Sequence, residues 1–271
     1  IAVECYQRYV KARPGDAAGW SRLGHLRRDN RDLDGAIADS TRAIELDPDV
    51  AEAYDVRMTA RFFKRDMDGV IQDCAKAIEL NPENANAFGY RGAAFQSKGN
   101  PDAAIADLTT MLRLRPGDFR AHLNRGNAFR SKGDLPSACN DYSMSLHANP
   151  KFAPAFINRG SARQALGDHD EAIADCTRAI EIDPTIPAPF QIRGISREAR
   201  GELEQAVSDF SRCVELQPGQ ADPYCLRAMA RAKAGDPRGA VEDARQALKL
   251  TSSPAQRREM ETLLRTLGEN P

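Results

Sequence analysis

The sequence lacks both a long apolar run and an excess of charge of either sign. Its 38 basic and 39 acidic residues leave a net charge of −1 over 271 residues. A protein that binds nucleic acid by general electrostatic attraction normally carries a basic excess, and a membrane-surface protein normally carries a polybasic stretch. We therefore expect no nucleic-acid partner. We also expect no membrane span, because that requires about 18 consecutive apolar residues.

Catalytic and metal-binding motifs are also missing. None of the six cysteines forms a Cys-x-x-Cys pair, so the common zinc and thioredoxin signatures are absent and we expect reduced, mostly buried thiols. The sequence contains no G-x-x-x-x-G-K-[ST], G-x-S-x-G or H-E-x-x-H motif. Its four histidines fall at different places along the chain. We therefore predict no catalytic residue, no metal site and no cofactor, and we predict that the chain is not an enzyme.

Lysine is scarce as well, since only eight of the 38 basic residues are lysine. This bias towards arginine is typical of GC-rich genomes and indicates a bacterial source. No secretory leader is visible, so we predict a cytoplasmic location. The sequence begins at Ile1 rather than at methionine, and we expect the parent array to begin upstream.

What the sequence does contain is a strict period. Seven prolines follow one another at steps of 34 residues: Pro14, Pro48, Pro82, Pro116, Pro150, Pro184 and Pro218. A fixed period of this length indicates a stacked array of repeats. Aligned by this period, the chain contains seven full repeats, at 17–50, 51–84, 85–118, 119–152, 153–186, 187–220 and 221–254.

Each repeat has the pattern of a helix pair. Its fourth residue is usually aromatic, its eighth is mostly glycine and its twentieth is almost always alanine. Apolar residues at three- and four-residue spacing, as in Ala172, Ile173 and Cys176, make one face of a helix. Small residues let the two helices approach closely. A helix pair cannot bury its apolar face alone, so neighbouring repeats must stack.

The predicted fold class is therefore all-α: a right-handed superhelical solenoid of seven helix-turn-helix repeats. Residues 1–16 fit the second half of a truncated repeat, with Ala2, Tyr6 and Tyr9 at the apolar places. Residues 255–271 form a capping helix with Met260, Leu263, Leu264 and Leu267 facing inwards. We predict a single solenoid domain over residues 1–271.

These residues resemble the tetratricopeptide repeat family over essentially the whole chain. The segment Trp20-Ser-Arg-Leu-Gly24, with Ala36, Ala43 and Pro48, is the most similar single copy. The resemblance implies that the first helices of successive repeats line a concave face that binds protein segments. The chaperone-binding class of these repeats uses Lys and Asn to hold a terminal carboxylate. Asp55 and Thr59 stand at two of those places, so we do not expect a chaperone tail as the ligand.

One cation and one anion recur at fixed places in the repeats. The seventh residue is arginine in six repeats, and the twenty-third is aspartate in all seven. Arginine suits a partly buried bidentate pair. A charged stripe for a ligand is the alternative, but the two signs in register would neutralise each other. We predict a structural ladder of Arg57, Arg91, Arg125, Arg159, Arg193, Arg227, Asp39, Asp73, Asp107, Asp141, Asp175, Asp209 and Asp243.

Candidate ligand contacts lie on the first helices, at the places that face away from the second helices. Asn124 and Asn158 stand one period apart, and an amide offers a donor and an acceptor to an extended backbone. This partly resembles the asparagine ladder of the O-linked N-acetylglucosamine transferases, although solvated surface asparagines would have the same spacing. Exposed aromatic residues are common binding anchors, although Phe62 or Phe63 would also fit inside the array. We predict partner contacts at Phe62, Phe63, Tyr90, Asn124, Asn127, Arg130, Asn158 and Gln164.

The predicted function is a protein-interaction scaffold that binds a partner peptide or helix in this groove. Two alternatives come from other classes. The chain is the recruiting region of a larger enzyme, or it is a self-assembling module that forms a homo-oligomer. The sequence beyond the two ends distinguishes the first alternative, and the apparent mass on dilution distinguishes the second.

Overall fold

The computed structural model describes residues 1–270, which contain sixteen α-helices and no strand. The all-helical repeat fold predicted from the sequence is confirmed. The chain divides into two compact units, one from Ile1 to Asp134 and one that begins at Leu135. Each unit is described by itself below. The right-handed superhelix and the single domain over the whole chain stay predictions.

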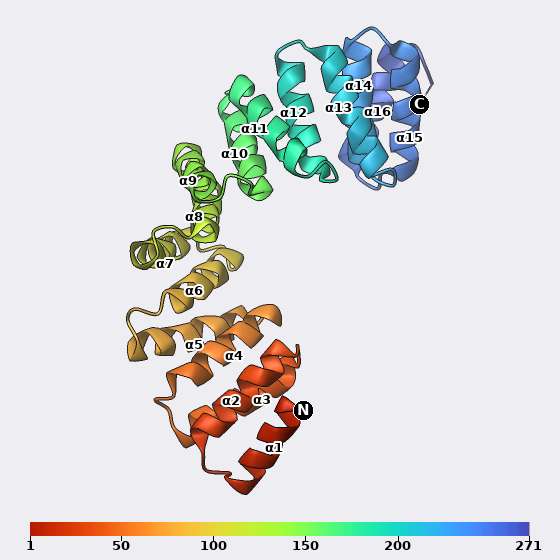
Figure 1. The fold of residues 1–271 in the computed structure, drawn as a ribbon. Coiled ribbons are helices and arrows are strands. Elements are labelled where there is room, and N and C mark those ends of the chain that lie inside the picture. Colours follow the sequence, from red (N-terminus) through yellow and green to blue (C-terminus); the bar gives the residue numbers. More distant parts are fainter. Residues whose placement is uncertain (271) are drawn as a thin grey trace. The chain divides into compact units, whose positions relative to one another are not determined.

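The first unit contains eight helices, and each packs on the next along the chain. Figure 1 shows them as successive pairs, from red to yellow-green. Their bounds are α1 (Ala2–Ala12), α2 (Ala17–Asp29), α3 (Leu33–Leu46), α4 (Ala51–Phe63), α5 (Met67–Leu80), α6 (Ala85–Ser97), α7 (Pro101–Leu114) and α8 (Phe119–Ser131). Alternate helices also touch, since α4 contacts both α2 and α6, and α6 contacts α8. The first helices of successive repeats thus line one face of the unit.

The second unit repeats this arrangement with eight further helices, again each packed on the next. They are α9 (Leu135–Ala148), α10 (Ala153–Leu166), α11 (His169–Ile182), α12 (Pro187–Ala199), α13 (Leu203–Leu216), α14 (Ala221–Lys233), α15 (Pro237–Leu250) and α16 (Pro254–Thr266). In all seven repeats the first helix begins at the first residue of the predicted repeat, and the second begins sixteen residues later.

Local hydrogen bonds explain where the helices begin and end. Asp32 and Asp66 stand just before α3 and α5, and each side chain accepts a hydrogen bond from the backbone N–H three residues later. Such caps satisfy N–H groups that the first turn leaves unpaired. Each of the seven full repeats except the last has a proline two residues after its second helix ends. The residue before a proline is driven to an extended conformation, which a helix cannot continue through.

The turn between the two helices needs one residue in the left-handed conformation. Gly99 has a φ of 73°, and glycine holds the same place in the four repeats that follow. Glycine adopts this conformation at little cost because it has no Cβ. In the first two repeats the place is held by Arg31 and Arg65, with φ values of 62° and 65°. The surrounding packing therefore imposes the turn even where the sequence does not favour it.

The two helices of a repeat fit together through complementary volumes. A Cβ at Gly194 would lie 2.6 Å from the ring of Phe210, and a Cβ at Gly92 would lie 2.9 Å from Leu108 Cγ. Both partners are fully buried. Where the first helix has a large residue, as at Met58, the residue opposite is the smaller Cys74, whose Sγ is 3.3 Å from Met58 Sδ. Gly92 and Gly194 are thus matched to large partners, whereas Gly24 and Gly160 face the small side chains of Ser40 and Cys176.

Gly194→Ala is expected to lower the free energy of unfolding by about 2 kcal/mol, because a buried ring must shift to admit the methyl group. Gly160→Ala is the matched control. Its Cβ would lie 3.0 Å from Cys176 Sγ, and we expect a loss below about 1 kcal/mol because alanine also favours the helix. Urea unfolding followed by circular dichroism measures both. Equal losses at the two positions would contradict the volume argument.

The terminal helices bury fewer residues than the interior ones. In α1 the buried residue is Val10, whereas Ala2 and Tyr9 are exposed, so two of the three expected inward places were wrong. In α16 Met260 and Leu264 are fully buried, as predicted. Leu263 and Leu267 are half-buried. Within residues 1–270, no helix combines the length and the hydropathy that crossing a membrane requires.

Candidate functional site

A groove runs along the first unit, lined mainly by α2, α4, α6 and α8, with further residues from α1 and α7. It consists of three hollows, which we name by their chemistry. The charged hollow, about 480 Å³, is lined by Arg22, His25, Arg28, Glu52, Asp55, Val56, Met58, Thr59, Asn86 and Tyr90. The aromatic hollow, about 360 Å³, is lined by Phe62, Asn86, Gly89, Tyr90, Ala93, Met111, Asp118, Arg120, Ala121 and Asn124. The tyrosine hollow, about 470 Å³, is lined by Cys5, Tyr6, Tyr9, Asp16, Ala18, Gly19 and Arg22.

The hollows adjoin one another, because neighbouring hollows share lining residues. Asn86 and Tyr90 on α6 line both the charged and the aromatic hollow. Arg22 on α2 lines both the charged and the tyrosine hollow. A ligand that fills the charged hollow therefore has further groove on either side of it.

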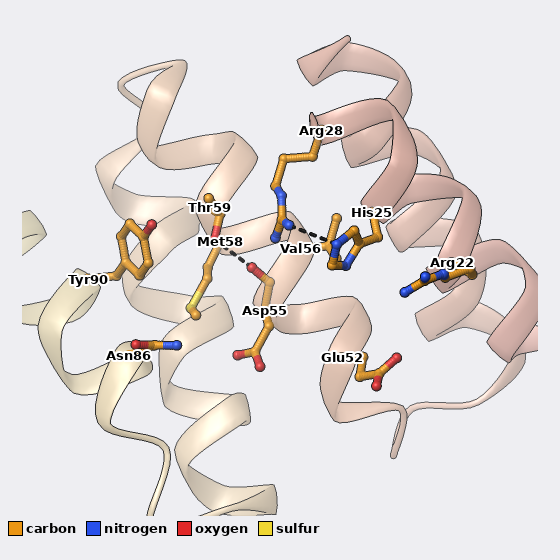
Figure 2. Close-up of a pocket in the computed structure, with 10 residues that line it drawn as sticks. All are labelled: Arg22, His25, Arg28, Glu52, Asp55, Val56, Met58, Thr59, Asn86 and Tyr90. Atoms are coloured by element: carbon orange, nitrogen blue, oxygen red, sulfur yellow. Dashed lines mark hydrogen bonds between the residues drawn. The ribbon is translucent and has the colours of Figure 1, made fainter. Parts of the chain in front are cut away.

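Cations line one wall of the charged hollow. Arg22, His25 and Arg28 stand three residues apart on α2, which places them on one side of the helix. Figure 2 shows all three directed towards the hollow. Arg28 Nη2 lies 3.2 Å from His25 Nε2 and donates to Asp29 Oδ1 at 2.9 Å. This bond holds the pKa of Asp29 below its ordinary value. Arg22 is exposed and has no polar partner among residues 1–270.

The opposite wall of the charged hollow presents a fixed carboxylate. Asn84 Nδ2 donates to Asp55 Oδ1 at 2.8 Å, while Asn84 Oδ1 accepts from the Ala87 N–H at 3.1 Å. The second bond is the N-terminal cap of α6, so one side chain both starts a helix and orients Asp55. Burial raises the pKa of Asp55, and the hydrogen bond from Asn84 offsets part of that effect. The hollow thus has cations on α2 and an oriented acceptor on α4.

The aromatic hollow is apolar at its centre. Phe62 and Tyr90 meet edge to face, with ring centroids 5.2 Å apart. Its other walls are small, because Gly89, Ala93 and Ala121 contribute little side chain. Met111 fills the space left by Gly89: a Cβ there would lie 2.7 Å from the methionine Sδ. A flexible thioether beside two aromatic rings adapts to apolar ligands of different shape.

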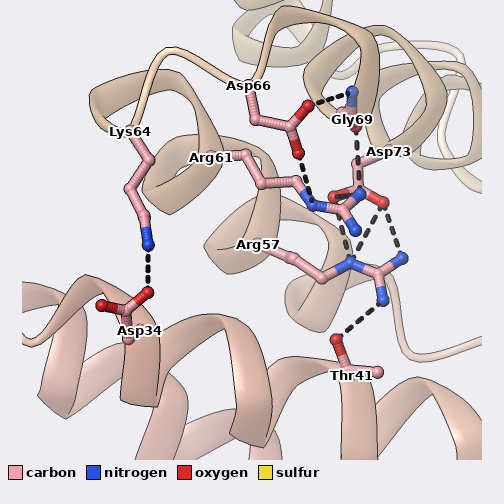
Figure 3. Close-up of polar contacts among 8 residues, drawn as sticks. All are labelled: Asp34, Thr41, Arg57, Arg61, Lys64, Asp66, Gly69 and Asp73. Atoms are coloured by element: carbon pink, nitrogen blue, oxygen red, sulfur yellow. Dashed lines mark hydrogen bonds and ion pairs between the residues drawn. The ribbon is translucent and has the colours of Figure 1, made fainter.

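The arginine–aspartate pairs lie away from this groove, between the two helices of each repeat. Figure 3 shows the second repeat, where Arg57 and Arg61 from α4 converge on Asp73 of α5. Arg57 Nη2 lies 2.7 Å from Asp73 Oδ1, and Arg61 Nη1 lies 2.9 Å from Asp73 Oδ2. Arg57 also donates to Thr41 Oγ1 of the preceding repeat at 3.1 Å. One guanidinium therefore joins the two helices of its repeat and the repeat before it.

The same arrangement recurs in the second unit. Three repeats have two arginines on one aspartate, namely Arg159 and Arg163 on Asp175, Arg193 and Arg197 on Asp209, and Arg227 and Arg231 on Asp243.

In the third repeat Phe95 replaces the second arginine, and Arg91 alone pairs with Asp107. Arg125 donates to Thr109 Oγ1, and Asp141 is buried. The first repeat has Leu23 in place of the first arginine, and Asp39 pairs with Arg27.

These carboxylates are internal rather than presented to a ligand. Asp73, Asp175, Asp209 and Asp243 are at most 3% exposed. Pairs of this kind fix geometry more surely than they add stability. A second series of ion pairs is exposed on the surface and links neighbouring repeats. In each pair a lysine contacts an aspartate of the preceding repeat: Lys64 with Asp34, Lys98 with Asp68 and Lys132 with Asp102. Within residues 1–270 no cluster of His, Cys, Asp or Glu is able to hold a metal ion.

The repeats match known family models. A model described as tetratricopeptide repeat matches residues 153–186, and a second with the same description matches residues 1–53 and 91–151. Together these ranges cover more than half of the chain. The chain belongs to the tetratricopeptide repeat family.

Solved structures of other tetratricopeptide repeat proteins have the same fold. YrrB, described as having an unusual peptide-binding site, is 22% identical with a TM-score of 0.61, over 73% of this chain and 99% of YrrB. The C-terminal part of a repeat protein from Cytophaga hutchinsonii is 16% identical with a TM-score of 0.72, over 88% of this chain and 98% of that one. A protein from Parabacteroides merdae is 18% identical with a TM-score of 0.65, over 92% and 98%. No curated protein matches the sequence.

The structure brings some of the predicted contact residues of this tetratricopeptide repeat chain together and leaves others apart. Phe62, Tyr90 and Asn124 line the aromatic hollow. Phe63 is 63% exposed and meets only the edge of Phe62, with ring centroids 6.2 Å apart. The other four lie outside the three hollows: Asn127 and Arg130 on α8, and Asn158 and Gln164 on α10 of the second unit. An asparagine row joining Asn124 to Asn158 therefore stays a prediction.

Sequence reasoning missed the cationic wall. Arg22, His25 and Arg28 hold the sixth, ninth and twelfth places of the first repeat. These are among the places taken as candidate contacts in the later repeats. The same rule applied to the first repeat would have found them. The signal is therefore present in the sequence of the first repeat.

Proposed function

We propose that the chain is a protein-interaction scaffold, and that its first unit binds a segment of a partner protein in the groove described above. The observation that carries the proposal is that the three hollows adjoin one another through shared residues, with the contacting rings of Phe62 and Tyr90 in the aromatic hollow. Partly buried aromatic residues in a concave site are typical anchors for a partner side chain. The peptide-binding site named for YrrB supports the same use of the fold.

The groove favours binding over catalysis. Its polar groups are of many kinds and come from several helices. In the tyrosine hollow the Tyr9 hydroxyl donates to Asp16 Oδ2 at 2.7 Å, and this bond holds the pKa of Asp16 below its ordinary value. A carboxylate with a lowered pKa is a poor general base at neutral pH. A preformed groove on stacked helices has little ordering entropy to lose on binding. We therefore propose a non-catalytic role for this chain, which is also the role it would have as the recruiting part of a larger enzyme.

A selection of random peptides displayed on phage tests the proposal. The full chain is the bait, and a Phe62→Ala/Tyr90→Ala/Asn124→Ala variant is the counter-selection. Enriched peptides are then synthesised and titrated by fluorescence anisotropy. Tyr90→Ala alone is expected to weaken binding about thirtyfold, which corresponds to the roughly 2 kcal/mol that a central aromatic anchor contributes.

Two controls keep this result specific to the groove. Met144→Ala removes an exposed apolar side chain of the second unit and is expected to leave the affinity unchanged. Circular dichroism must show that Tyr90→Ala keeps its helical content. If enriched peptides bind the triple variant as tightly as the parent chain, function does not reside in this groove.

A further inference from the structure

We propose that the groove of the first unit recognises an extended peptide segment carrying an apolar side chain and an internal acidic side chain about three residues apart. This inference rests on the proposed function and adds the chemistry of the partner. The apolar side chain enters the aromatic hollow. The acidic side chain meets the cationic wall of the charged hollow, and main-chain groups of the segment meet the carboxylate and amides between them.

The aromatic hollow fits a single apolar side chain. Phe62 and Tyr90 supply two aromatic walls whose rings already contact each other at 5.2 Å. Met111 packs over Gly89 and adds a flexible thioether to the lining, and Ala93 and Ala121 keep the remaining apolar walls small. The charged residues, Asp118 and Arg120, lie at the N-terminal end of α8. Burying an apolar side chain here removes apolar surface from water on both partners.

The cationic wall fits an acidic side chain. Three residues of α2 with basic side chains face the charged hollow (Figure 2). Arg28 is already bonded to Asp29, whereas Arg22 has no polar partner within the described residues. A ligand carboxylate that pairs with Arg22 satisfies a guanidinium that the fold leaves to solvent, and Arg–carboxylate pairs are often bidentate. Glu52, the acid nearest the start of α4, makes no ion pair with it.

Asp55 on the opposite wall repels a second carboxylate of the ligand and favours a hydrogen-bond donor at that place. Asn84 fixes its Oδ1, which leaves Oδ2 to accept a main-chain N–H from the ligand. The amides of Asn86 and Asn124 line the same path and offer both donors and acceptors. The arrangement thus matches an extended backbone with one acidic side chain turned towards α2.

The spacing follows from the repeat geometry. The charged hollow is lined from α2, α4 and α6, and the aromatic hollow from α4, α6, α7 and α8, so the aromatic hollow lies one repeat further along. Packed helices lie about 8–10 Å apart, and an extended chain advances about 3.3 Å per residue. The two side chains are therefore about three residues apart.

The acidic group is an internal side chain rather than a chain terminus. Arg22 lies between two hollows, since it also lines the tyrosine hollow with Tyr6 and Tyr9. A segment whose acidic residue pairs with Arg22 is thus able to continue along α1 past that point. A terminal carboxylate would leave the tyrosine hollow without a ligand.

Defined peptides test this recognition. The probes are fluorescein-labelled nine-residue peptides of serine and glycine with an amidated C-terminus. Each carries one Phe and one Glu, at separations of one, three and six residues and in both orders. Anisotropy titrations to millimolar concentration give the affinities. We expect the peptides with a separation of three residues to bind most tightly, in one of the two orders. Replacing Glu by Gln should weaken the affinity about threefold, and replacing Phe by Ala should weaken it about thirtyfold.

Matched protein variants assign these preferences to residues. Arg22→Gln is expected to abolish the preference for Glu over Gln while the preference for Phe persists. Arg42→Gln, which removes an exposed arginine of α3 whose partner is Glu45, is expected to preserve both preferences. If the two variants lose the preference for Glu equally, the effect is one of net charge and the inference is wrong.

Other outcomes separate this inference from the proposed function. If phage-selected peptides bind the groove but show neither the acidic residue nor the spacing, the scaffold function stands and the inference falls. If the peptides bind only with a free C-terminal carboxylate, the internal acidic side chain is overturned. If neither the selected nor the defined peptides bind, both proposals fail.

Discussion

Asp73→Asn is expected to lower the free energy of unfolding by about 3 kcal/mol. Asp73 is 2% exposed and receives hydrogen bonds from both Arg57 and Arg61. An asparagine of the same shape has no charge, and it presents one acceptor oxygen in place of two. Arg57 would then lose its counter-charge, and Arg61 would keep only its longer contact with the exposed Asp66 at 3.5 Å. Removing one partner of a buried pair in this way is costly. Urea unfolding of the full chain, followed by circular dichroism, measures the loss.

Asp107→Asn is the matched control, because it lies at the same place in the next repeat and holds Arg91 alone. We expect about half the loss. In the Asp73→Asn variant, backbone amide hydrogen exchange should increase most in α4 and α5. The reason is that the stability of stacked repeats is a sum of local and nearest-neighbour terms. A loss of equal size in the two variants would show that the second arginine contributes nothing.

Asp39→Asn is expected to have the opposite effect and to stabilise the chain by about 2 kcal/mol at pH 7. Leu23 stands where the other repeats have the first arginine, so Asp39 has Arg27 as its ion-pair partner, with Nε 3.2 Å from Oδ2. The adjacent Ser40 Oγ is also buried and lacks a hydrogen-bond partner. Burial raises the pKa of Asp39 to about 6, against the smaller opposing effect of Arg27.

The sign of the pH dependence follows from this shift. Between about 3.8 and about 6 the folded chain binds more protons at Asp39 than the unfolded chain does. The stability contributed by this group is therefore present below pH 3.8 and lost as the pH rises through this window. The increase in the free energy of unfolding caused by Asp39→Asn should be smaller when urea unfolding is repeated at about pH 4.5.

Arg27 is not stranded by this substitution, because its Nε also lies 3.7 Å from Asp32 Oδ2. The difference from Asp73 lies in Arg57, whose carboxylate partner is Asp73. Arg61, like Arg27, keeps a second carboxylate, since its Nε lies 3.5 Å from Asp66 Oδ2. A destabilised Asp39→Asn at pH 7, or a gain that does not change with pH, would show that Arg27 compensates fully for the burial of the carboxylate.

The repeated features of the fold were predictable because their causes lie within a few residues. Caps such as Asp32 and Asp66 act on N–H groups three residues away, and the prolines stop helices locally. The pairing of Arg57 with Asp73 was predictable because arginine and aspartate recur at the same two places of successive 34-residue repeats. Arg61 was missed because Phe95 and Phe129 interrupt the arginine at its place in the repeat. A residue type that is missing from some repeats is a weaker signal than one that recurs in every repeat.

The candidate site was predicted less well, because single residues from several helices make it. Phe62 and Tyr90 lie 28 positions apart in the sequence, and only packing of α4 against α6 brings their rings into contact. The partnership of Asn84 with Asp55 spans 29 positions and follows no repeated pattern. The exposure of Phe63, beside the half-buried Phe62, likewise depends on how α4 is rotated in the stack.

The family, the helix pairs and their boundaries follow from the sequence, because a fixed period and short-range hydrogen bonds repeat the same local structure along the chain. Which side chains meet in the groove and which face solvent depends on how the helices pack. The structure also reveals that Asp39 is buried with a single arginine partner and that Arg31 and Arg65 adopt the turn of a glycine. These features depend on contacts between residues far apart in the chain, where small differences in volume and charge between repeats decide the outcome.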